Sequence, residues 1–163
     1  MKLRVGISAC LLGEEVRYDG GHKHHITITQ TLSPHVEWVS VCPEVELGLG
    51  TPRSPIELRL VAGEIALVCQ ASEADLTSQM VACAQRRCEE LERLKLSGYI
   101  FKARSPSCGL VSVRWDAPGL FAGFLRRRWP QMPMVEETAL MTVQDCEAFL
   151  ERVRNYGSRF PTP

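Results

Sequence analysis

The sequence predicts a single α/β domain of Rossmann-like type, with a mostly parallel sheet, helices on both faces and one β-hairpin outside that pattern. Short apolar runs typical of buried strands alternate along the chain with amphipathic segments typical of helices. The length of 163 residues is within the usual size of one domain, and 45% hydrophobic with 23% charged residues is ordinary for a globular protein. We expect residues 1–156 to form the domain and residues 157–163 to form a flexible tail.

Strands are expected where a short apolar run stops at a turn. The runs that meet this description are Leu3–Ser8, Val36–Val41, Tyr99–Ala103 and Met132–Glu136. Two further runs, Ile56–Val61 and Ile65–Cys69, flank a short turn-forming segment that contains Gly63. The alternation of Ile56, Leu58 and Leu60 in the first of these runs indicates a half-buried strand, so the pair predicts a hairpin.

The strongest helix prediction is Leu76–Leu96, whose apolar residues recur at helical spacing. Asp75 is expected to cap its N-terminus, and Gly98 stands where a C-terminal cap belongs. Thr142 and Asp145 have the spacing of a capping box and predict a helix that begins after Thr142. Two other helices are expected within His24–Leu32 and over Gly119–Trp129.

Charge and cysteine usage narrow the class of protein. The 19 basic and 19 acidic residues cancel, so we expect neither stable nucleic-acid binding nor attraction to a membrane surface. No stretch approaches the ~20 apolar residues of a membrane-spanning helix. The apolar run near the N-terminus is too short for the hydrophobic region of a signal peptide. Seven cysteines, an odd number without a Cys-x-x-Cys pair, favour free thiols in a cytoplasmic protein.

Cys10, Cys42 and Cys108 each follow a predicted strand. Because the carboxyl ends of parallel strands share one edge of a sheet, where such sheets bind ligands, these cysteines are expected to converge. Three thiolates suggest a metal or iron–sulfur site with one open position, since structural zinc takes four ligands and no obvious fourth accompanies them. Buried core cysteines are the alternative interpretation, because free cysteine is among the most buried residue types.

The segments around these cysteines resemble, in their order and spacing, one bacterial family, the thiouracil desulfidases. The resemblance covers about Val5 to Glu136. The segments that carry it are Gly6–Gly13 (GISACLLG), Arg17–Gly21 (RYDGG), Val41–Glu44 (VCPE), Gly50–Arg53 (GTPR) and Ser105–Gly109 (SPSCG). It implies a 4Fe–4S cluster held by Cys10, Cys42 and Cys108, with the fourth iron open, and therefore cluster-delivery machinery as a partner.

The resemblance also implies a reaction, the non-redox hydrolytic desulfuration of a thiolated pyrimidine (thio-UMP or thiouracil) to the oxo-pyrimidine and hydrogen sulfide. Glu44 matches the family's carboxylate, which would activate water, and Ser105 matches its serine, a proton relay or substrate contact. Ser107 is a second candidate for that contact with substrate. The basic residues expected to bind a substrate phosphate are Arg17, Lys23 and Arg53.

Two other functions use the same residues differently. A non-catalytic iron–sulfur or thiol redox sensor would need the three cysteines but neither Glu44 nor Ser105. A small-molecule binding module with structural cysteines would be colourless and free of metal. Substitution of Glu44 separates an enzyme from a sensor, because only the enzyme loses its function while the cluster stays.

Overall fold

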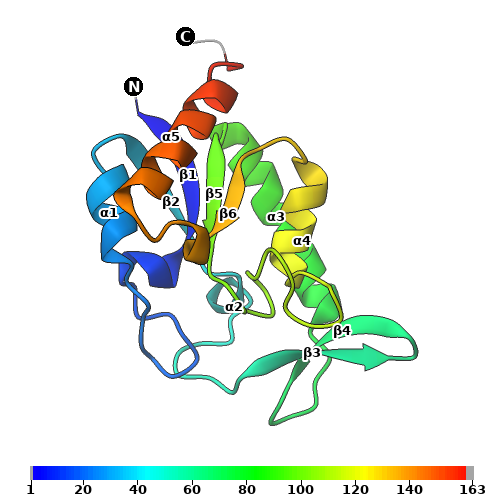
Figure 1. Cartoon of the computed structure of the whole chain (residues 1–163). Coiled ribbons are helices and arrows are strands. Elements are labelled where there is room, and N and C mark those ends of the chain that lie inside the picture. The colour runs from blue at the N-terminus through cyan, green and yellow to red at the C-terminus, as the bar shows by residue number, and fades with distance from the viewer. Residues whose placement is uncertain (1, 161–163) are drawn as a thin grey trace.

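The computed structural model describes residues 2–160 and is built around a four-stranded parallel sheet (Figure 1). Its strands are β1 (Leu3–Ser8), β2 (Val36–Val41), β5 (Gly98–Phe101) and β6 (Met134–Glu136). They lie in the order β2-β1-β5-β6, and every neighbouring pair is parallel. β1 and β2 have the predicted bounds, β5 and β6 are shorter than predicted, and the predicted α/β fold is confirmed.

Helices cover both faces of this sheet (Figure 1). They are α1 (Ile26–Leu32) with α5 (Val143–Gly157) on one face, and α3 (Thr77–Leu94) with α4 (Leu120–Arg128) on the other. Side chains alternate across a strand, so Ile100 joins the core under α1 and α5, whereas Tyr99 and Phe101 join the core under α3 and α4. No helix within residues 2–160 is long and apolar enough to cross a membrane.

The predicted hairpin is also confirmed. It consists of β3 (Ile56–Val61) and β4 (Glu64–Cys69), which pair antiparallel and form a sheet of their own. Figure 1 shows it beyond the end of the main sheet at which the parallel strands finish, close to α2 (Pro43–Glu46). The short 3-10 helices η1 (Ala9–Leu12) and η2 (Glu137–Ala139) follow β1 and β6 directly.

The C-terminal end of α3 differs from the prediction. The helix ends at Leu94, and Lys95 takes the left-handed cap conformation at φ 54°. Gly98, which the sequence indicated as the cap, opens β5 instead. A Cβ at Gly98 would lie 2.7 Å from Cγ2 of Val153, so this glycine allows α5 to pack closely on the strand.

The N-terminal caps give one correction and one confirmation. The N-cap position of α3 is Leu76, and Asp75, one residue earlier, accepts a hydrogen bond from the Thr77 N–H at 2.9 Å. At α5 the Thr142 side chain accepts from the Asp145 N–H, and the Asp145 carboxylate accepts from the Thr142 N–H. The predicted capping box is therefore present.

The helix before the expected tail extends to residue 157. Gly157 is the last residue of α5 and is buried, and a Cβ there would lie 2.5 Å from Cδ2 of Leu3. Residues 158–160 form a turn after the helix, and residues 161–163 lie outside the described residues.

The strand order places a topological switch point beside β1. The chain passes from β1 to β2 on one side of it and later returns to β5 on the other side. Segments that follow β1 and β5 therefore diverge at their carboxyl ends, and open α/β sheets bind ligands in the crevice formed there.

Candidate active site

A pocket of about 630 Å³ lies at the carboxyl ends of β1, β2 and β5. Eight of the nine residues that the sequence singled out line it: Cys10, Cys42, Cys108, Arg17, Lys23, Glu44, Arg53 and Ser105. The ninth, Ser107, is fully buried and is not among the lining residues. The fold thus brings segments that are up to about a hundred positions apart in the sequence into one pocket.

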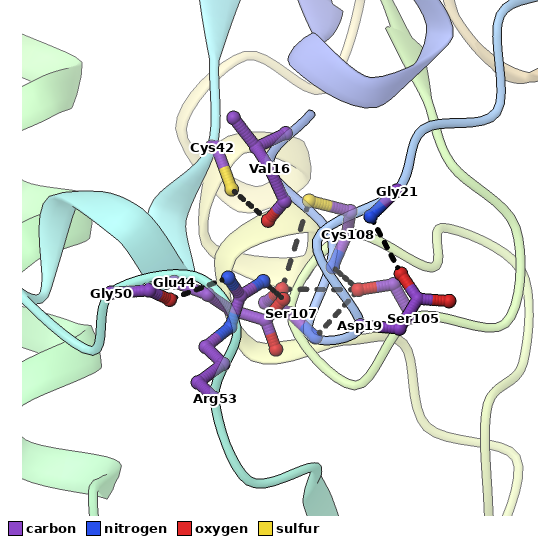
Figure 2. Close-up of polar contacts among 10 residues, drawn as sticks. All are labelled: Val16, Asp19, Gly21, Cys42, Glu44, Gly50, Arg53, Ser105, Ser107 and Cys108. Atoms are coloured by element: carbon purple, nitrogen blue, oxygen red, sulfur yellow. Dashed lines mark hydrogen bonds and ion pairs between the residues drawn. The ribbon is translucent and has the colours of Figure 1, made fainter. Parts of the chain in front are cut away.

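Each cysteine comes from a different strand end. Cys10 is in η1 directly after β1, Cys42 follows the last residue of β2, and Cys108 is in the loop after β5. Cys10 and Cys108 are buried and Cys42 is half-buried, and all three are free thiols. Figure 2 shows the sulfurs of Cys42 and Cys108 on the same side of the site, and the Cys42 sulfur lies 3.9 Å from the carbonyl oxygen of Val16.

Burial decides the protonation of these thiols. It raises the pKa of Cys10 to about 11, against the opposing effect of the Arg17 and Lys102 charges. It also raises the pKa of Cys42 and the pKa of Cys108. Reactive cysteines have lowered pKa values, so these three are poor nucleophiles and become thiolates when a metal takes the place of their protons.

The donor set fits an iron–sulfur cluster. No fourth cysteine lines the pocket, and thiolates are the ligands that hold such clusters. No three His, Cys, Asp or Glu side chains within residues 2–160 are close enough together to hold one metal ion. A cluster makes a different demand, because each cysteine binds a separate iron and the sulfurs stay apart.

Glu44 stands at the entrance of α2 and is fixed by Arg53. The Arg53 Nη2 donates to Glu44 Oε2 at 2.9 Å, and Arg53 Nη1 donates to the Gly50 carbonyl at 2.9 Å (Figure 2). The Arg53 side chain is 4% exposed and that of Glu44 is 18% exposed. These two contacts give Arg53 a positioning role toward Glu44, while its Nε, like that of Arg17, is buried without a hydrogen-bond partner in the described residues.

The two serines before Cys108 have distinct surroundings. Ser105 Oγ accepts the N–H of Cys108 at 3.1 Å and the N–H of Ser107 at 3.3 Å. A hydroxyl oxygen has two lone pairs, so Ser105 has its acceptor capacity filled and its one proton left to donate. Ser107 Oγ lies 3.1 Å from Ser105 Oγ and 3.7 Å from the Cys108 sulfur (Figure 2).

The pocket wall contains an ion pair that was not predicted from the sequence. Lys102 Nζ donates to Glu137 Oε1 at 2.6 Å, and Glu137 Oε2 accepts the N–H of Ala103 at 2.6 Å. The register of β5 and β6 pairs Phe101 with Glu136, so the next residue of each strand reaches the same strand end. The sequence held two signals of this ion pair: Lys102 ends one apolar run, and Glu136 and Glu137 stand together at the end of the next.

The pocket carries more positive than negative charge. Its two glutamates, Glu44 and Glu137, are both paired with cations. Arg17, Lys23 and Arg104 also line it, and within residues 2–160 none of these three forms an ion pair. Arg17 Nε is buried without a hydrogen-bond partner in the described residues, and a bound anion would supply one.

Comparison with known proteins agrees with this site. The family model of the 2-thiouracil desulfurases matches residues 5–137, and the chain belongs to this family. YbbK, an uncharacterized protein of Bacillus subtilis (strain 168), is 34% identical over 108 residues, which are 63% of this chain and 71% of YbbK. A solved structure of a 4Fe–4S-dependent thiouracil desulfidase, TudS, is similar with a TM-score of 0.75 and 28% identity, over 92% of this chain and 99% of TudS.

Proposed function

We propose that this member of the 2-thiouracil desulfurase family removes sulfur hydrolytically from a thiolated pyrimidine, thio-UMP or thiouracil, with a 4Fe–4S cluster on Cys10, Cys42 and Cys108. The observation that carries the proposal is that three free thiols and one fixed carboxylate, Glu44, line the same pocket. In the reaction the ring C=S and water become C=O and hydrogen sulfide. The carbon keeps its oxidation state, so no oxidant or reductant is consumed.

The protein's part begins with the cysteines, whose three thiolates would hold the cluster. When bound, the cluster would supply a Lewis acid suited to a soft thiocarbonyl sulfur, which would make the ring carbon more electrophilic.

Glu44 is the general base in this proposal. Its Oε2 is engaged by Arg53, while its Oε1 accepts no hydrogen bond from a protein group within residues 2–160. That oxygen is available to take a proton from water as the C–O bond forms. The sulfur then leaves with the electron pair of the C–S bond, and the two protons of the water end on it.

Ser105 acts as a proton donor. Since its oxygen already accepts two backbone N–H groups, it has no role as a base, and its hydroxyl proton is the part it offers to the substrate. Without substrate this proton points to Ser107 Oγ, 3.1 Å away. With substrate bound it would turn toward the departing sulfur, and Ser105 would then recover a proton from water.

The surplus of cations favours an anionic substrate, and hence the nucleotide. Arg17 and Lys23 would bind the phosphate of thio-UMP, with Arg104 as a third cation that the sequence analysis did not name. Arg53 would orient Glu44, and its contact with the phosphate stays a prediction.

Partners and compartment follow from the same chemistry. A cluster-bearing protein receives its cluster from delivery machinery, and all seven cysteines are free, as in a reducing cytoplasm. The formal net charge of zero gives no support to stable nucleic-acid binding.

Glu44→Gln tests the proposal against the redox-sensor alternative. We expect the variant to keep the visible absorbance of the cluster and to lose turnover of 4-thio-UMP by about 10²–10⁴-fold, the usual contribution of a general base. Glu15→Gln is the matched control, because Glu15 is exposed and does not line the pocket. Full turnover by Glu44→Gln would remove Glu44 as the base, and a wild type with cluster but no turnover would favour the sensor.

A further inference from the structure

Ser107 lies behind the pocket. It is fully buried, it is absent from the pocket lining, and its hydroxyl lies 3.7 Å from the Cys108 sulfur with the serine as donor. A hydroxyl has one proton, so when Ser107 donates to the sulfur, its 3.1 Å contact with Ser105 requires Ser105 to be the donor there. Without substrate the order of donation is therefore Ser105 to Ser107 to Cys108. Contact of Ser107 with substrate, which the sequence suggested, stays a prediction.

Ser8 approaches the same sulfur from β1. It is buried at the end of that strand, and its oxygen accepts the N–H of Lys102 at 2.9 Å. Its own proton is free for a second partner: burial raises the pKa of the Cys108 thiol, and the Ser8 hydroxyl opposes this as a hydrogen-bond donor. Two serine hydroxyls, one at the end of β1 and one in the loop after β5, thus act on one cysteine.

The other two cysteines have no such hydroxyls within the described residues. Cys42 stands before α2 and receives the backbone N–H groups of Glu44 and Val45. At Cys10, burial raises the pKa of the thiol, and the charges of Arg17 and Lys102 oppose this effect. Cys108 is also a deeply buried thiol, for which an unaided thiolate would be costly.

We propose that Ser107 and Ser8 are positioning residues that hold Cys108 as a thiolate ligand of the cluster through two O–H···S hydrogen bonds and thereby raise the reduction potential of the cluster. This inference rests on the proposed function, since it needs the cluster. A thiolate has no proton and only accepts hydrogen bonds. Reduction adds negative charge to the cluster, and hydrogen-bond donors to its sulfurs stabilise that charge. Such donors therefore raise the reduction potential of the cluster.

The test compares Ser107→Ala and Ser8→Ala with wild type and with Ser112→Ala. Ser112 is exposed in the loop four residues after Cys108 and makes no side-chain hydrogen bond within the described residues, so it is a matched control. Each protein is loaded with iron and sulfide without oxygen. Iron content is measured, and the reduction potential is measured by a redox titration followed by electron paramagnetic resonance.

We expect Ser107→Ala and Ser8→Ala each to retain the cluster and to shift its potential to more negative values, with Ser112→Ala unchanged. An unchanged potential in both alanine variants overturns the inference and leaves the proposed function standing. A wild type that binds no cluster overturns the proposed function and the inference together. If one alanine variant fails to fold, the other decides the question, because the two serines are on separate segments.

Discussion

The pairing of Glu44 with Arg53 predicts that two substitutions which break the same contact have unequal costs. Glu44→Gln leaves a guanidinium that is only 4% exposed without its counter-charge, and breaking a buried pair in this way costs about 3–5 kcal/mol. Arg53→Met leaves a carboxylate that is 18% exposed and borders the pocket, where water can solvate it, so we expect about 1–3 kcal/mol. A difference of about 2 kcal/mol is roughly a 30-fold difference in the unfolding equilibrium.

Anaerobic urea unfolding followed by circular dichroism measures these free energies, for both single variants and for the double variant Glu44→Gln/Arg53→Met. Because the pair is removed only once, the double variant is expected to lose about 1–3 kcal/mol less than the sum of the single losses. Two single costs below about 0.5 kcal/mol that simply add would show a solvated surface pair and refute the reasoning. A larger cost for Arg53→Met than for Glu44→Gln would contradict the burial argument.

Three further predictions concern residues outside this pair. Glu137→Gln is expected to cost about 1–3 kcal/mol in urea unfolding and to speed cluster loss, because the half-buried Lys102 would lose its partner; an unchanged midpoint would show that the pair contributes nothing. Among the seven cysteines, Cys69 is expected to react first with iodoacetamide at pH 7, since hydrogen bonds from Ser72 lower the pKa of its thiol to about 7. Peptide mapping should show its rate rising about tenfold per pH unit below pH 7 and levelling above it, and earlier labelling of another cysteine would count against this. Thr142→Ala is expected to cost about 1 kcal/mol and to lower Tm by about 2–4 °C with turnover unchanged, as a lost helix cap does in calorimetry.

The sequence was informative where a pattern has one physical meaning. Apolar runs that stop at turns predicted the strands, and each of the three cysteines after those runs reached the pocket. Gly98 shows the limit, because a glycine after a helix has two uses. Here it allows Val153 to pack close to the strand while Lys95 ends the helix, and that contact between α5 and β5 is visible only in three dimensions.

Register is the other information that the sequence lacks. Lys102 and Glu137 meet because β5 and β6 pair in parallel with Phe101 opposite Glu136, and neither apolar run specifies that alignment. Ser107 illustrates the same limit on a smaller scale. Its place beside Cys108 suggested a substrate contact, whereas the direction of its side chain behind the sulfur depends on how the loop folds.

The most direct test of the central claim is turnover by the wild-type protein, loaded with iron and sulfide without oxygen and supplied with 4-thio-UMP. UMP and hydrogen sulfide are followed together. The proposed function predicts that both are released in equal amounts over many turnovers without added reductant or oxidant. An intact cluster that releases neither product, or that releases UMP only once per protein, would contradict it.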